Sequence, residues 1–108
     1  MSIFELTEET WQQAVLLSSV PVLVDIWAPW CVPCRKVTPM VEQLAREFGG
    51  RLVIATLNGD DAPRLMSRYE VLSLPTLLLF SGGEPVERVA GVPKIDKLRA
   101  VIASHLEH

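Results

Sequence analysis

Two cysteines, Cys31 and Cys34, are the residues of this 108-residue chain best suited to carry out chemistry. Two residues separate them, a spacing that suits a reversible dithiol–disulfide couple. A bond between them closes too small a loop to stabilise the fold much. Disulfide-dependent secreted domains usually contain more cysteines, at other spacings. The pair therefore indicates thiol chemistry rather than structural cross-linking.

Inert structural thiols and half of a metal site are the alternative interpretations of this pair. A tetrahedral zinc site needs four ligands, and only His105 and His108 are left to complete one. His108 belongs to Leu106-Glu107-His108, which looks like the start of an expression tag. We therefore expect no metal site.

The cysteine pair lies where an apolar strand meets a helix. The run Val22–Trp27 is almost continuously apolar, which is typical of a strand buried on both faces. A helix is expected over about residues 32–49, with Pro39 inside it as a kink. Its apolar residues recur at helical spacing: Val37, Met40, Val41, Leu44, Ala45 and Phe48.

This placement predicts a reactive thiol. The first turn of a helix presents unpaired backbone N–H groups and a positive dipole end, which stabilise a thiolate. Cys31 should therefore ionise more easily than a free cysteine. Cys34, expected one turn inside the helix, is close enough to attack a mixed disulfide formed by Cys31. Pro33 removes one N–H donor and stiffens the loop between the two cysteines.

Asp25 is the one charged residue in the apolar run. A charged, unpaired carboxylate in such a strand costs several kcal/mol, so we expect burial to raise its pKa. A raised carboxyl pKa near a thiol suits proton transfer. We interpret Asp25 as the group that accepts the Cys34 proton through water. The alternatives are a buried, hydrogen-bonded Asp and one that reaches the strand edge.

The rest of the chain alternates between short apolar runs and stretches of helical period. We expect Phe4 in a short edge strand, and a helix over about 8–18, capped by Thr7, whose inner face is Trp11, Ala14 and Val15. Further strands are expected over 52–57, over 76–80 and, after a turn at 81–84, up to Gly91. Further helices are expected from Pro63 to Tyr69, capped by Asp60 or Asp61, and from Pro93 onwards.

This pattern, βαβαβαββα, predicts a single α/β domain over 1–105, followed by the tag remnant at 106–108. Helices between buried strands imply a central sheet covered on both faces, and the closing hairpin makes that sheet mixed.

Composition excludes several other classes of protein. With 49% apolar and 21% charged residues, the chain is not disordered or collagen-like. A net charge of −3 argues against nucleic acid or an anionic membrane as the main partner. Asp25 and Pro75 interrupt the apolar runs, so neither run spans a bilayer. The first residues do not look like a signal peptide. We expect a cytoplasmic monomer.

The chain resembles the thioredoxin family from Phe4 to about Ser104. Its segment Asp25-Ile26-Trp27-Ala28-Pro29-Trp30-Cys31-Val32-Pro33-Cys34 looks like the active-site strand and loop of that family. Pro39 matches the helix-kinking proline, Leu74-Pro75-Thr76 the cis-proline loop, and Gly83 and Gly91 two later glycines. The resemblance implies the thioredoxin fold.

The resemblance also implies roles for single residues. Cys31 would be the exposed attacking cysteine and Cys34 the resolving one. Pro75 would be cis and lie against the disulfide, although an X-Pro bond is usually trans. The backbone of Leu74 would bind an extended substrate peptide. Trp30 would be an exposed aromatic beside the site, Trp27 an aromatic packed beneath it, and Gly91 the residue that keeps the peptide groove open.

The function implied is that of a protein-disulfide reductase. The Cys31–Cys34 dithiol would reduce disulfides in client proteins, and a flavoprotein, thioredoxin reductase, would regenerate it with NADPH. The chain itself would bind no cofactor.

Two residues at the reaction centre depart from the family pattern. Val32 replaces the usual glycine between the cysteines, and its β-branched side chain restricts the loop. Thr56 replaces a lysine common on the neighbouring strand, so we expect Asp25 to keep its proton to higher pH than in relatives with that lysine. These departures leave two alternatives to a reductase. One is a thiol oxidant or isomerase, and the other is a peptide-binding or chaperone module without turnover.

Overall fold

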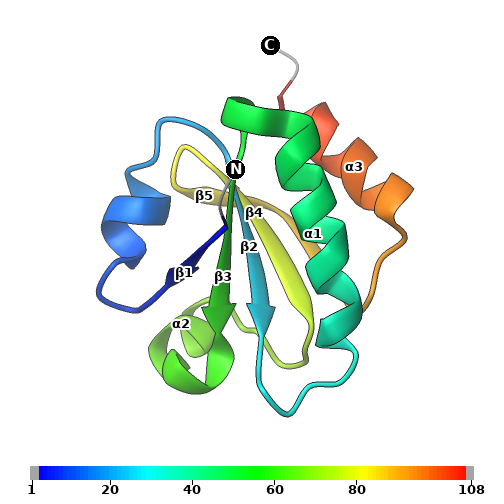
Figure 1. The fold of residues 1–108 in the computed structure, drawn as a ribbon. Helices are drawn as coiled ribbons and strands as arrows, with labels where there is room; N and C mark the ends of the chain where they lie inside the picture. The colour runs from blue at the N-terminus through cyan, green and yellow to red at the C-terminus, as the bar shows by residue number, and fades with distance from the viewer. Residues whose placement is uncertain (1–2, 107–108) are drawn as a thin grey trace.

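A five-stranded sheet with strand order β1-β3-β2-β4-β5 forms the centre of the computed structural model, which describes residues 3–106 (Figure 1). β3 pairs in parallel with β1 and β2, whereas β4 runs antiparallel to β2, and β5 antiparallel to β4. The mixed sheet expected from the closing hairpin is therefore confirmed. The strands are β1 (Phe4–Leu6), β2 (Val22–Trp27), β3 (Val53–Asn58), β4 (Thr76–Ser81) and β5 (Glu84–Ala90).

Helical segments cover both faces of the sheet (Figure 1). α1 (Cys34–Phe48) and α3 (Ile95–Ser104) pack on one face, and α2 (Pro63–Arg68) and the π-helical segment η1 (Gln12–Leu16) pack on the other. Two short 3-10 segments, η2 (Gly49–Arg51) and η3 (Gly59–Asp61), precede and follow β3. Pro39 lies inside α1, as predicted.

Side-chain alternation along the strands divides the core into two layers. On β2, Val22, Val24 and Ile26 point towards η1 and α2, whereas Leu23 points towards α1 and α3. Asp25, two residues after Leu23, lies on the α1 side as well. The α1 layer is otherwise apolar and includes Leu23, Val37, Val41, Leu44, Ile54, Leu77, Leu79, Leu98 and Ile102.

The N-terminal helix expected over 8–18 is shorter than predicted. Turns occupy residues 8–10, and only Gln12–Leu16 is helical, with π geometry. Thr7 and Thr10 bond reciprocally: each backbone N–H donates to the other side-chain hydroxyl, at 2.9 and 3.1 Å. This reciprocal pair has the pattern of a capping box, with Thr7 as the capping residue of the turns that lead into η1. Trp11 and Val15 are buried as expected.

α2 begins at Pro63 as predicted, but the cap expected for α2 and the start expected for α3 were wrong. Neither Asp60 nor Asp61 caps α2. Instead the backbone N–H of Arg64 donates to Glu8 Oε2 at 2.8 Å, so the acceptor comes from the other end of the chain. α3 begins at Ile95 rather than Pro93, because Lys94 is still extended (ψ 139°).

Three loops leave the sheet at the same end. Ile26 at the end of β2 pairs with Thr76 at the start of β4, which pairs with Ala90 at the end of β5. The loops that follow Trp27, precede Thr76 and follow Ala90 therefore lie side by side at this end of the sheet, the lower end in Figure 1. This row of strand ends positions the cysteine loop.

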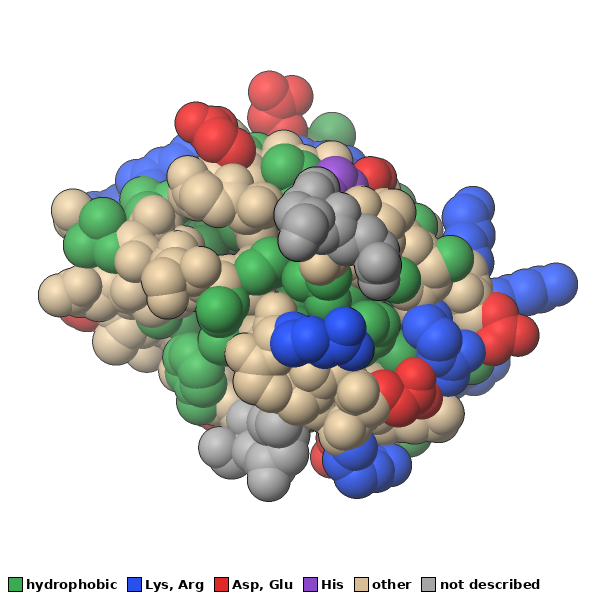
Figure 2. Space-filling view, turned by 90° about the horizontal axis from the view of Figure 1, so that it is seen from above, with side chains coloured by type: hydrophobic (Ala, Val, Ile, Leu, Met, Phe, Trp, Pro, Cys, Tyr) green, Lys and Arg blue, Asp and Glu red, His purple; other side chains and the backbone are tan. Residues whose placement is uncertain are grey.

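The opposite end of the molecule carries charges of both signs. Figure 2 shows acidic and basic side chains interspersed around this face, with apolar side chains between them. None of the helices in residues 3–106 is long and apolar enough to cross a lipid bilayer.

Candidate active site

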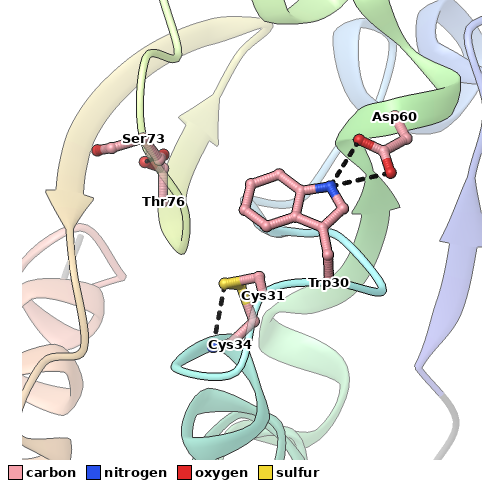
Figure 3. Close-up of a disulfide and its surroundings, with 6 residues drawn as sticks. All are labelled: Trp30, Cys31, Cys34, Asp60, Ser73 and Thr76. Carbon is pink, nitrogen blue, oxygen red and sulfur yellow. Dashed lines mark hydrogen bonds between the residues drawn. A yellow bond between two sulfur atoms is a disulfide. The ribbon is translucent and has the colours of Figure 1, made fainter.

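Cys31 and Cys34 form a disulfide at the start of α1 (Figure 3). Their Cα atoms are 5.4 Å apart. α1 begins at Cys34 itself, so the expectation that Cys34 lies one turn inside the helix was wrong. Pro33 occupies the cap position with φ −58°, which suits the fixed ring of proline. The second cysteine of the disulfide is therefore the first residue of the helix.

The helix N-terminus acts on the sulfur of Cys31. The backbone N–H of Cys34 donates to Cys31 Sγ at 3.3 Å (Figure 3). This N–H is one of the first of α1, which have no partner within the helix. When the disulfide is reduced, the same donor and the positive end of the helix dipole favour a thiolate on Cys31.

Both cysteines are buried in this disulfide form. Cys31 is 3% exposed and Cys34 is 4% exposed. The expectation of an exposed Cys31 was therefore wrong for this state of the molecule. The reason is packing: the disulfide and Ala28 form a small apolar cluster that Trp27 and Leu74 cover.

The loop before β4 covers one side of the disulfide. Its Leu74–Pro75 peptide bond is cis, and Pro75 is buried. The Thr76 hydroxyl donates to the Ser73 carbonyl at 2.7 Å and ties this loop together (Figure 3). The N–H of Gly91 donates to the Pro75 carbonyl at 2.9 Å and joins this loop to the end of β5.

Gly91 has positive φ (+82°), and a Cβ placed there would have no atom within 4 Å. The space above Gly91 is therefore open.

Trp30 lies on the surface beside the disulfide and is 67% exposed. Its indole N–H donates to both carboxylate oxygens of Asp60, each at 3.1 Å (Figure 3). This role of Asp60 was not predicted from the sequence. The expected pairing of the two strands could have indicated it. β2 and β3 are parallel neighbours, so the loops that follow their ends must lie side by side. Trp27 is half-buried under the loop, and Val32 is 62% exposed.

Asp25 is 2% exposed, and its Oδ1 has no hydrogen-bond partner among the described residues. Burial raises its pKa from 3.8 to about 6. Asp25 borders a cavity of about 300 Å³ that also reaches both cysteines, Thr38 on α1 and Thr56 on β3. Thr56 is the direct partner of Asp25 across the β2–β3 pairing. The cavity thus connects the carboxyl to both sulfurs of the disulfide.

A disulfide that closes so small a loop at a helix start can open and close without disturbing the core. The fold and this site define a thiol–disulfide oxidoreductase that acts on protein disulfides. The thioredoxin family model matches residues 2–104, so the chain belongs to the thioredoxin family.

Relatives of known name agree with this assignment. Thioredoxin 1 of Nostoc sp. is 42% identical over 102 residues, which cover 94% of this chain and 95% of that protein. Thioredoxin of Pyropia yezoensis is 43% identical over 95 residues, covering 87% of this chain and 89% of that protein. Chloroplastic Thioredoxin M-type of Spinacia oleracea is 43% identical over 91 residues, which cover 83% of this chain but only 50% of that protein.

The reaction is dithiol–disulfide exchange, and thioredoxins need no bound cofactor for it. Among residues 3–106, no group of three or more His, Cys, Asp or Glu side chains is placed to hold a metal ion.

Proposed function

We propose that this protein reduces disulfides in client proteins, with Cys31 as the attacking thiol and Cys34 as the resolving one. The Cys31 thiolate attacks one client sulfur, the client disulfide breaks, and the released client thiolate takes a proton. Cys34 then gives up its proton and attacks Cys31 Sγ. The second client sulfur leaves as a thiolate, so the client gains two electrons and the protein becomes a disulfide.

The bond from the Cys34 N–H to Cys31 Sγ is the observation that carries the order of the two thiols. It places a helix N-terminal donor on Cys31 and not on Cys34. Because the thiolate is the nucleophile, the sulfur that is better stabilised as a thiolate attacks first. Cys34 lines the cavity that Asp25 also lines, so a group that can remove its proton borders the same space.

Asp25 is that group. Its carboxyl lines the same cavity as Cys34, and its pKa of about 6 is suited to accepting a proton near neutral pH. No direct hydrogen bond joins Asp25 to either cysteine. A cavity of about 300 Å³ has room for water, so the proton passes from Cys34 to Asp25 through water.

The client segment binds across the cis-proline loop. Leu74 covers the disulfide, and no hydrogen bond within residues 3–106 uses its backbone N–H or C=O. These groups are free to pair with an extended client segment, as an added strand does. Trp30, Val32 and Pro33 border the segment on one side, and the open space above Gly91 lies on the other.

The electrons come from NADPH through a flavoprotein, thioredoxin reductase, and the protein works in the cytoplasm. With these partners the exchange would run in the reducing direction. The test of direction is a redox titration of Cys31–Cys34 against a dithiol buffer. A strongly reducing midpoint supports a reductase in spite of Val32. A markedly oxidising midpoint would assign the site to oxidation or isomerisation.

The order of the thiols is tested by trapping. Cys34→Ser should accumulate covalent client adducts on Cys31, because the resolving step is lost. Cys31→Ser, which keeps Cys34, is the matched control and should trap few. Equal trapping by the two variants, or no adduct with Cys34→Ser under mild oxidation, would overturn the proposed order.

A further inference from the structure

Exposed apolar side chains gather around the disulfide. Of the seven large apolar side chains exposed in residues 3–106, four lie in the three loops at this end of the sheet. They are Trp30, Val32, Leu72 and Val92. Single exposed apolar residues are ordinary, but a group of them around a reactive centre marks an interaction surface.

Leu72 is the most exposed of these four, at 94%. It stands two residues before Leu74, which packs on the disulfide. Two residues of chain span at most about 7 Å, so the Cα of Leu72 lies within that distance of the Cα of Leu74. Its neighbour Val71 is buried, which anchors the loop on that side. Leu72 is therefore held beside the site with its side chain in solvent.

The sheet fixes the order of the apolar residues. Since the strand order is β3-β2-β4-β5, the loop of Trp30 and Val32 comes first, the loop of Leu72 next, and the loop of Val92 last. A client cysteine bonded to Cys31 sits between the first and second loops. A client segment that pairs with the backbone of Leu74 must then carry its neighbouring side chains past Leu72.

We propose that Leu72 is a specificity-determining residue that selects clients with an apolar side chain within two residues of the reacting cysteine. This inference rests on the proposed function, because it assigns the substrate class of the same site. The occupant is an extended, cysteine-containing segment of a client protein.

The test uses two short peptides, each a disulfide-linked homodimer, that differ only in the residues two positions before and after the cysteine. These residues are Leu in one peptide and Ser in the other. The second-order rate of reduction is measured for the reduced wild-type protein and for Leu72→Ser. The wild type should prefer the Leu peptide, and Leu72→Ser should lose about three- to tenfold of its rate on that peptide alone.

Leu17→Ser is the matched control. Leu17 is also exposed, at 63%, but lies between η1 and the start of β2, at the opposite end of the sheet. It should leave both peptide rates unchanged. Leu72→Lys should in addition speed reduction of a third peptide with Glu at the two positions, because the contact becomes electrostatic.

The outcomes distinguish the role of Leu72 from the disulfide-reductase function on which it rests. If Leu72→Ser keeps the full preference for the Leu peptide, or if Leu17→Ser loses it equally, the role of Leu72 is overturned. The role is also overturned if Leu72→Ser slows only turnover with thioredoxin reductase and NADPH, since Leu72 then contacts the reductase. If the wild type reduces neither the peptides nor a small aromatic disulfide, the proposed function itself fails.

Discussion

Asp25 and Thr56 face each other across the parallel pairing of β2 and β3, and both line the cavity that reaches Cys34. A threonine in this position brings a hydroxyl but no charge to the buried carboxyl. Burial is accordingly the cause that raises the Asp25 pKa to about 6. The one basic residue that lines the cavity, Arg35, is exposed at the start of α1. The charge state of Asp25 is therefore governed by desolvation.

The raised pKa predicts how stability depends on pH. The folded state holds the Asp25 proton more tightly than the unfolded state, so stability falls as pH rises from about 3.8 to about 6. Asp25→Asn removes this loss. In the disulfide form, we expect this variant to be more stable than the wild type at pH 8, by up to about 3 kcal/mol. Urea unfolding at pH 4 and pH 8 measures the difference.

The gain in Asp25→Asn should be small at pH 4, because this pH is only just above the ordinary carboxyl pKa of 3.8 and little of the linkage has developed there. Asp61→Asn, which removes an exposed carboxylate, is the control and should show no such pH-dependent gain. A gain of equal size at both pH values would show that the effect is packing and not proton linkage.

Position 56 carries no charge, so placing a cation there should change the pKa of Asp25. Thr56→Lys should lower the Asp25 pKa below about 6, since an ammonium group within about 4–6 Å favours the carboxylate. Carboxyl NMR titration of Asp25 measures this directly. Thr56→Met is the control, because methionine is close to lysine in length but carries no charge. It should not lower the titration midpoint of Asp25. An ordinary Asp titration in the wild type would contradict the argument from desolvation.

The sequence was sufficient to predict the layers of the fold and the position of the reactive sulfurs. The apolar run around Asp25 identified a strand buried on both faces, and the cysteine spacing placed a thiol pair at the following helix. These features are encoded locally, in period and spacing. The cis bond before Pro75 was expected only from the family resemblance.

Features that depend on contacts between segments distant in the sequence could not be predicted from period and spacing. The acceptor for the Arg64 N–H is Glu8, 56 residues away, so the local candidates Asp60 and Asp61 were wrong. Cys31 was expected to be exposed, but Leu74 comes from another loop to cover it. The period of the apolar residues also did not reveal that the N-terminal helical segment, Gln12–Leu16, has π geometry.

Gly83 is predicted to be required by packing and not only by its turn. A Cβ at Gly83 would lie 2.8 Å from the Leu16 carbonyl oxygen, and φ is +82°. Gly82 also has positive φ (+61°), but a Cβ there meets nothing within 4 Å. Gly83→Ala should therefore destabilise by about 2–4 kcal/mol, and Gly82→Ala by about 1 kcal/mol. Chemical unfolding measures both, and equal losses would contradict the packing argument.

The bond between Trp30 and Asp60 predicts that the aromatic beside the disulfide is held in place from η3, the segment that follows β3. Asp60→Ala removes both acceptors of the indole N–H, so its NMR signal should shift and exchange faster with water. Because both side chains are exposed, the loss of stability should stay below about 1 kcal/mol. Reduction of client peptides should slow, whereas reduction of a small aromatic disulfide should not. Asp61→Ala, one residue further on, is the matched control, and an unchanged indole signal in Asp60→Ala would show that packing alone holds Trp30.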